Sequence, residues 1–225
     1  MKQILFLNIL TCFILLIGCT SEASEKVVQY QKNNEIIGEE REELIGEVSP
    51  TIYETIQRTN EEAEEILVSP IERPGVGITP PAGRYMIHTG EPGRVPQSGR
   101  VVVSDENGVI LLEEVLGLGG VERVTLNLNG SHEVYFDGLD WAYLIPVPTE
   151  QLNELTAGIW EVGADIAAGS YTVVAASELE FGYLQIFEEG NDPRIFEIIN
   201  SPSIQVEIKE GQILKINGVS YLKFE

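Results

Sequence analysis

Apolar and polar residues alternate strictly in several short runs along most of the chain. Residues 124–128 and 204–208 are two clear examples. Alternation with a period of two predicts strands that have one buried and one solvated face. Further short runs of this kind, separated by turns rich in Gly, Asn, Asp and Pro, continue to the C-terminus. This spacing predicts small antiparallel β-sandwiches or barrels.

The strand pattern occurs twice along the chain. Residues 76–85 match residues 162–171, since Val-Gly is followed in both copies by Ala-Gly-x-Tyr at the same spacing. Later, Asp137-Gly138 in the first copy answers Asn217-Gly218 in the second, and both dipeptides favour two-residue turns with positive φ. A repeat of this length indicates two tandem modules of one architecture.

The expected organisation follows from these patterns. The two β modules cover residues 71–148 and 158–225. Ahead of them, residues 19–50 are polar and rich in Glu, which predicts a flexible acidic tether. Residues 51–69 are expected to form a short helix, because apolar residues recur there at near-helical spacing opposite a run of glutamates. The predicted fold class is therefore mainly β, with a short helix and a flexible tether before the tandem modules.

The N-terminus carries the pattern of a secretion signal. An apolar run of about 14 residues follows Lys2, too short to cross a hydrocarbon core of ~30 Å. It ends in Leu16-Ile17-Gly18-Cys19, which resembles the lipobox of bacterial lipoproteins. The resemblance implies a signal peptide over residues 1–18, cleavage after Gly18, and a diacylglyceryl group on Cys19 that anchors the protein to the extracytoplasmic face of a cell membrane. An ordinary signal peptide with an incidental cysteine, or a membrane-spanning segment, is the alternative.

The second module carries a longer motif, Trp160-Glu161-Val162-Gly163-Ala164-Asp165-Ile166-Ala167-Ala168-Gly169-Ser170-Tyr171, with Glu210-Gly211-Gln212 further on. This resembles an uncharacterised β module of secreted proteins and lipoproteins of Gram-positive bacteria, with the pattern Trp/Tyr-x-Val-Gly-x-Asp-Ile-x-x-Gly-x-Tyr. The first module departs from it, because Pro74 stands where the Trp would be and residues 78–81 replace the Asp-Ile element. The resemblance implies a fold and an extracytoplasmic place, and it assigns no catalytic residue.

Charge and cysteine content exclude some classes of partner. Acidic residues outnumber basic ones by 36 to 14, giving a net charge of -22. Because binding to a nucleic acid needs a basic face, no nucleic-acid partner is expected. Cys12 and Cys19 are the only cysteines, and cleavage removes the first, so neither a disulfide nor a thiolate zinc site is expected. No metal or cofactor is expected. The acidic segments 105–108 and 188–192 suit tight turns, with calcium binding as the alternative.

Few residues suggest chemistry. His88 and His132 are the only histidines; His88 is expected at an exposed strand position. Gly130-Ser131-His132-Glu133 has the residue types of a hydrolase triad, but adjacent residues cannot form that relay. Four aromatic residues are candidates either for the core or for a sugar- or peptide-binding surface: Trp141, Tyr143, Trp160 and Tyr221.

Three functions remain open on these grounds. The first is a non-enzymatic, membrane-anchored lipoprotein that binds a protein or envelope ligand through its tandem β modules. The second is a structural or stress-related envelope component without a dedicated ligand. The third is an extracytoplasmic hydrolase or an accessory to one, which no triad or metal set supports.

Overall fold

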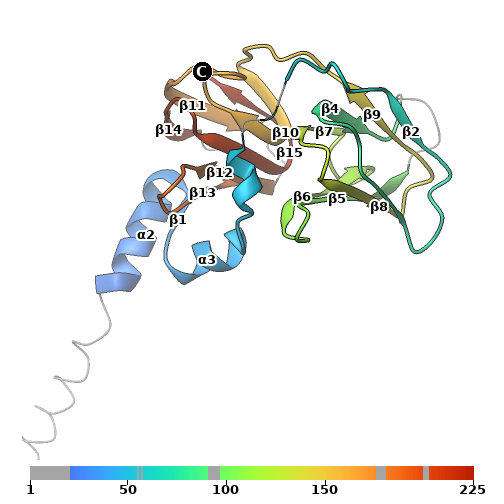
Figure 1. Cartoon of the computed structure of the whole chain (residues 1–225). Coiled ribbons are helices and arrows are strands. Elements are labelled where there is room, and N and C mark those ends of the chain that lie inside the picture. The colour runs from blue at the N-terminus through green and yellow to red at the C-terminus, as the bar shows by residue number, and fades with distance from the viewer. Residues whose placement is uncertain (1–20, 55, 57, 91–96, 176–180, 200–202) are drawn as a thin grey trace, which may run out of the picture.

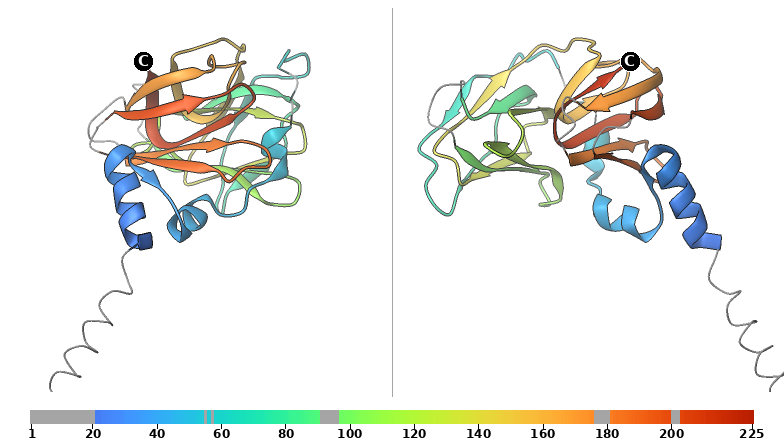
Figure 2. Two further views of the ribbon diagram at one scale, coloured as in Figure 1. Left: turned by 90° about the vertical axis from the view of Figure 1, so that its left-hand side faces the viewer. Right: turned by 180° about the vertical axis from the view of Figure 1, so that it is seen from behind.

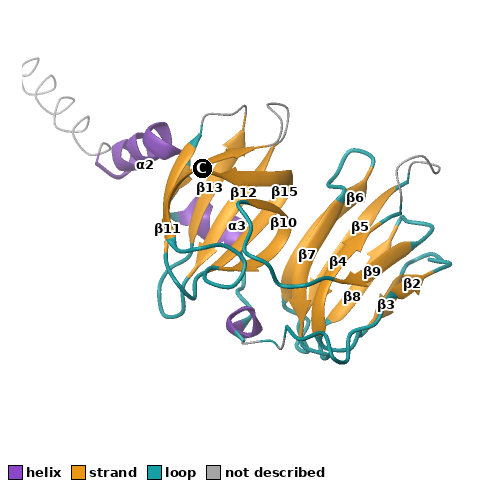
Figure 3. Ribbon diagram, turned by 90° about the horizontal axis from the view of Figure 1, so that it is seen from above, coloured by secondary structure: helices purple, strands orange, loops and turns teal. Residues whose placement is uncertain are grey.

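The chain is mainly β, as predicted, and forms two β modules that lie side by side (Figures 1 and 3). The computed structural model describes residues 21–54, 56, 58–90, 97–175, 181–199 and 203–225. The predicted signal peptide and Cys19 lie outside the described residues. Within the described part of the chain, no helix is long and apolar enough to cross a membrane.

The first module is a sandwich of two four-stranded layers. One layer has the order β2-β9-β4-β7 and the other β3-β8-β5-β6. Side chains such as Tyr85, Val101 and Leu126 alternate inward from these strands and are fully buried. The strands are β2 (Ile66–Val68), β3 (Val76–Ile78), β4 (Gly83–His88), β5 (Ser98–Ser104), β6 (Ile110–Gly117), β7 (Arg123–Leu128), β8 (Glu133–Asp137) and β9 (Ala142–Pro146).

The second module repeats the strand pairings of the first. Its strands are β10 (Glu154–Glu161), β11 (Gly169–Ala175), β12 (Phe181–Phe187), β13 (Arg194–Ile199), β14 (Ile204–Ile208) and β15 (Ile213–Phe224). The pairs β11·β14 and β12·β13 answer β4·β7 and β5·β6. The long strand β10 takes the place of β2 and β3, and the long strand β15 takes the place of β8 and β9. The two long strands pair with each other along both halves, as β2 pairs with β9 and β3 with β8.

The register agrees as well, which supports a true duplication. Tyr85 lies opposite Leu126 in the first module, and the matching Tyr171 lies opposite Val206 in the second. The match of Val76 with Val162 is wrong, however. Val76 pairs with Phe136 in the first module. Ile216 takes the place of Phe136 in the second module, and it pairs with Gly158, so Val76 corresponds to Gly158 and not to Val162. The Val-Gly likeness of residues 76–77 and 162–163 is therefore a coincidence of sequence.

The Asp-Gly and Asn-Gly dipeptides form corners and not hairpin turns. Gly138 and Gly218 have positive φ, as predicted, at 73° and 76°. However, β8 and β9 belong to different sheets, and β15 continues through Gly218. Another strand approaches this corner closely, since a Cβ on Gly182 would lie 2.0 Å from the Asn217 carbonyl oxygen. Each corner thus moves the chain from one layer of the sandwich to the other.

The expected flexible tether is wrong for the described part of residues 19–50. This segment forms α2 (Ser21–Asn33), β1 (Glu35–Ile36) and α3 (Glu39–Ile45). Strand β1 pairs with β13 of the second module, α3 contacts β13, and α2 projects from the module (Figures 1 and 2). Glu, Lys, Gln and Ala favour helices even without an apolar stripe. Docking supplies the rest, because Asn33 forms two 2.7 Å hydrogen bonds with the backbone of Gln205 and Ile36 is buried.

The expected helix over residues 51–69 is also wrong. The structure has a short 3₁₀ helix, η1 (Pro50–Tyr53), and strand β2, which pairs with β9. Residues 55 and 57 lie outside the described residues. The segment is rich in Thr and Ile, whose branched side chains disfavour a helix. Asn60 has a φ of 56°, and its side chain binds the backbone of Arg84 and Val147, which holds the segment extended along β4.

The two modules share part of one core. Ala157, Phe187 and Ile213 of the second module pack into the hydrophobic cluster of the first. One parallel bridge, from Gly158 to Thr125, joins β10 to β7, so that a single sheet of 11 strands extends across both modules. The modules therefore form a continuous body, and α3 packs against the second module (Figure 3).

Candidate functional site

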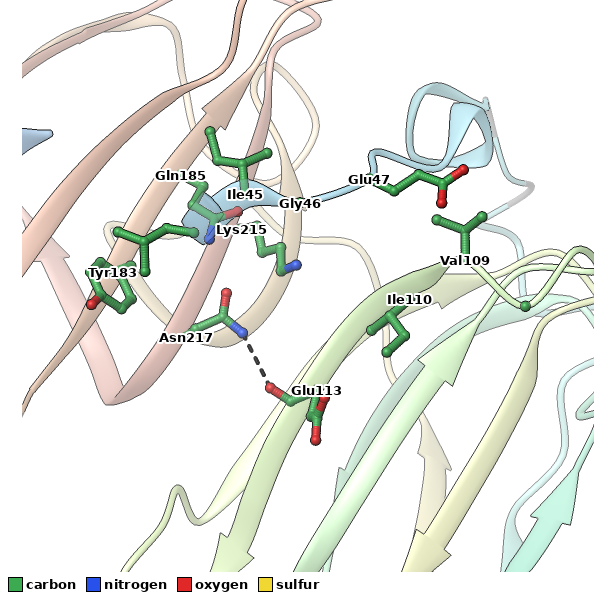
Figure 4. Close-up of a pocket in the computed structure, with 12 residues that line it drawn as sticks. Ile45, Gly46, Glu47, Val109, Ile110, Glu113, Tyr183, Gln185, Lys215 and Asn217 are labelled. Carbon is green, nitrogen blue, oxygen red and sulfur yellow. Dashed lines mark hydrogen bonds between the residues drawn. The ribbon is translucent and has the colours of Figure 1, made fainter. Parts of the chain in front are cut away.

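An open pocket of about 520 Å³ lies where α3, the first module and the second module meet (Figure 4). Its volume falls in the range of about 300–1,000 Å³ that is typical of small-molecule sites. Both modules and the N-terminal segment contribute, so neither module has this pocket alone. We call it the inter-module pocket; its lining residues are Leu44, Ile45, Gly46, Glu47, Gly108, Val109, Ile110, Glu113, Tyr183, Gln185, Lys215 and Asn217.

Lys215 is the cation of the inter-module pocket. It lies on β15 opposite Gln185 of β12, and strand alternation turns both side chains away from the core of the second module. Burial lowers the pKa of the Lys215 amine, and the nearby carboxylates of Glu114 and Glu113 oppose that shift. Among the described residues, the amine has neither a hydrogen bond nor an ion pair. A partly desolvated ammonium that has nearby carboxylates but no direct hydrogen bond or ion pair with a described residue can still receive an anionic group.

Two amide side chains lie beside Lys215 on the same face of the sheet. Gln185 is 5% exposed, and its Oε1 is buried without a hydrogen-bond partner in the described part of the chain. The same holds for Oδ1 of Asn217, whose Nδ2 donates to the Glu113 carbonyl oxygen at 3.4 Å (Figure 4). An unpaired buried acceptor costs about 1–3 kcal/mol. These two groups therefore favour a donor at the base of the pocket.

Three carboxylates lie around the pocket, and two of them already have partners. Glu113 pairs with Arg100 at 3.0 Å, and buried Glu114 accepts a 2.8 Å hydrogen bond from the Gly218 backbone N–H. Burial raises the pKa of Glu114, against the smaller opposing effect of that hydrogen bond. Glu47 is exposed and has no hydrogen bond or ion pair with a described residue. Lys215 and Glu47 are therefore the charged pocket residues without a direct hydrogen bond or ion pair to a described residue.

A buried ion cluster locks the modules together beside this region. The Asp165 carboxylate is fully buried and pairs with Arg84 of β4 at 2.9 Å and with Arg58 at 2.8 Å. Arg58 also binds Glu161 at 2.7 Å, and the Arg84 guanidinium lies 4.8 Å from the centre of the Trp160 ring. Trp160 and Asp165 belong to the recognised motif of the second module. In this chain they join the second module to the first.

The structure brings His132 to a distant serine and a carboxylate, but not in the order of a hydrolase triad. His132 Nε2 lies 3.2 Å from the Thr51 hydroxyl, which lies 2.8 Å from the Ser49 hydroxyl; Ser49 donates to Asp105 at 2.6 Å. The hydroxyls thus separate the imidazole from the carboxylate, whereas a triad places the imidazole between them. All four side chains are buried. Burial lowers the pKa of His132, against the opposing charges of Glu54 and Asp105.

The other sequence around His132 forms a local turn. The Asn129 side-chain oxygen accepts hydrogen bonds from the backbone N–H groups of Ser131 and His132 and from the Ser131 hydroxyl. Such Asx turns are a common use of asparagine. Ser131 is therefore engaged at its own turn and takes no part in the buried chain that contains His132.

The acidic segments are turns, as the turn interpretation predicted. One Asp105 oxygen accepts the backbone N–H groups of Asn107 and Val109, and the other accepts the Ser49 hydroxyl, whose hydrogen bond is the main reason that the pKa of Asp105 is lowered. In the second module, Glu188 binds Gln212 at 2.9 Å and Asp192 pairs with Arg41 at 3.2 Å. Within the described residues, no group of three or more potential ligands could hold a metal ion.

The aromatic candidates do not form one surface. Trp160 is 4% exposed and donates to the Thr156 carbonyl oxygen, whereas Tyr221 lies exposed on β15. Trp141 and Tyr143 are half-buried in the first module, where Tyr143 stacks on His88 with ring centres 5.4 Å apart. His88 is likewise half-buried, and so less exposed than predicted.

Sequence reasoning missed Lys215, Gln185 and Glu47. Alternation along residues 181–187 and 213–217 signals that Tyr183, Gln185 and Lys215 leave the core of their module. Nothing in the sequence signals that β6 and α3 lie over that face. Comparisons with protein-family models, with curated proteins and with solved structures found no match to this chain.

Proposed function

We propose that this chain is a non-enzymatic, lipid-anchored protein of the extracytoplasmic membrane face that binds a small envelope ligand in the inter-module pocket. The observation that carries the binding role is Lys215, which has no direct hydrogen bond or ion pair among the described residues and lines a pocket formed by both modules and α3. The lipobox-like Leu16-Ile17-Gly18-Cys19 supports the anchor.

The binding role is tested by identifying any small molecule that remains bound to the purified native protein. The native protein is extracted from its membranes, denatured, and the released small molecules are identified by mass spectrometry. The variant Ile110→Trp fills the pocket from the β6 side and is expected to release none of the ligand. Leu118→Trp is the matched control, because Leu118 is 71% exposed and does not line the pocket.

The anchor is tested separately by Cys19→Ala. Loss of membrane fractionation and of labelling by a palmitate analogue is expected, because the diacylglyceryl group needs the cysteine sulfur. Unchanged fractionation and labelling would contradict the anchor.

A structural envelope component without a ligand is the second candidate. The buried ion cluster and the shared core favour it, since they hold the modules rigidly together. That role predicts that the wild type and Ile110→Trp release the same small molecules, which would contradict the binding role.

A further inference from the structure

We propose that the inter-module pocket binds a small zwitterion, a free amino acid or short peptide, through its carboxylate at Lys215 and its ammonium group at Glu47. This inference rests on the proposed function, because it names the ligand class of the same pocket. It begins from two charged side chains of the pocket wall, Lys215 and Glu47, that have no direct hydrogen bond or ion pair with any residue the structure describes.

Lys215 and Glu47 are the complementary pair of charges that a zwitterion requires. Figure 4 shows the Lys215 amine pointing away from the second module into the space between the modules, and the Glu47 carboxylate beside Val109 at another part of the pocket wall. The remaining nearby charges, Glu113 and Glu114, are held by Arg100 and by the Gly218 backbone. An anion alone would use Lys215 but leave Glu47 unpaired. Charge-assisted hydrogen bonds at both ends are stronger than neutral ones.

The polar base and the apolar wall fit the rest of such a ligand. A peptide or amino-acid N–H supplies the donor that the Gln185 and Asn217 amide oxygens lack, once those amides turn toward it. Leu44 and Ile110 are 38% and 46% exposed and line the pocket together with Ile45. An aliphatic side chain of the ligand would cover these carbons. Leucine and leucyl-leucine are therefore suitable probes.

Calorimetric titration of the purified full chain in detergent tests the ligand class. Four probes separate its parts: leucine, leucyl-leucine, leucinamide, which lacks the carboxylate, and isocaproate, which lacks the ammonium group. Leucine or leucyl-leucine is expected to bind at least about tenfold more tightly than either truncated probe. Tighter binding of leucyl-leucine identifies a peptide, and equal binding identifies a free amino acid.

Matched variants locate each charge. Lys215→Met is expected to lower the affinity for the zwitterionic probe at least about tenfold and to leave the affinity for leucinamide unchanged. Glu47→Gln is expected to lower the affinity for the zwitterionic probe and to leave the affinity for isocaproate unchanged. Lys209→Met is the control, because Lys209 is an exposed lysine of the same module outside the pocket.

The outcomes separate this inference from the proposed function. A molecule that the wild type releases and Ile110→Trp does not, but that lacks an amine or a carboxylate, overturns the zwitterion and leaves the binding role intact. Binding of none of the four probes, or equal binding by the Lys215→Met variant, also overturns it. Only the absence of a pocket-dependent molecule overturns the binding role as well.

Discussion

Asp165 illustrates how one buried carboxylate can hold two modules together. It is fully buried, and its Oδ1 accepts from both Arg58 and Arg84, while Oδ2 accepts the Glu161 backbone N–H. Burial lowers the pKa of Arg84, against the attraction of Asp165. Asp165 therefore supplies the counter-charge that this buried guanidinium needs.

We predict that Asp165→Asn lowers the free energy of unfolding by about 3–5 kcal/mol, because it leaves the Arg84 charge buried without its counter-ion. Urea unfolding measures the change. Asp137→Asn is the matched control, since it removes the carboxylate of an exposed pair with Arg100 and should cost less than about 1 kcal/mol. Equal losses in both variants would contradict the role of the buried ion cluster.

His132 makes stability depend on pH in a defined direction. Its folded pKa lies below the ordinary value of 6.5, so the unfolded chain binds this proton first as the pH falls. The free energy of unfolding should therefore decrease from pH 6.5 down to the folded pKa, and His132→Gln should reduce that slope. Urea titrations at several pH values measure it. An unchanged slope in the variant would assign the effect to other groups.

At the scale of elements, the close approach of β10 to β7 depends on Gly158. Its φ is 140°, and a Cβ there would lie 2.0 Å from the Thr125 carbonyl oxygen. Gly158→Ala should cost about 2–4 kcal/mol, from strain together with overpacking. Thermal unfolding measures the loss. Gly190→Ala adds a methyl group at a φ of 80° with no atom within 4 Å, so about 1 kcal/mol is expected there.

Alternation along the chain was sufficient to predict the strands and the repeat, because each strand must bury one face. It could not distinguish a hairpin turn from a corner at Asp137-Gly138, since both need positive φ. The polar N-terminal segment defeated the prediction for another reason. Its order comes from contacts with the second module, such as Asn33 with Gln205, which are distant in sequence. The inter-module pocket escaped prediction for the same reason.

At the scale of the molecule, the shared core and the continuous sheet couple the modules. Phe187 and Ile213 of the second module pack in the first core, and β10 joins β7. We predict a single thermal transition in scanning calorimetry, with a ratio of calorimetric to van't Hoff enthalpy of about 1. Two separate transitions would show that each module unfolds alone, and would contradict this coupling.

Helix α2 changes how a membrane attachment at Cys19 would hold the body. It begins two residues after the cysteine, spans 13 residues or about 20 Å, and projects from the second module (Figure 1). Tyr30 donates to Glu197, and Asn33 binds the outer edge of β14, so the helix is fastened at its far end. With Cys19 in the lipid, α2 would be a helical spacer between the bilayer and the second module. The 13-residue helix would then separate the second module from its own membrane-proximal end by about 20 Å, a separation that a flexible tether would not fix.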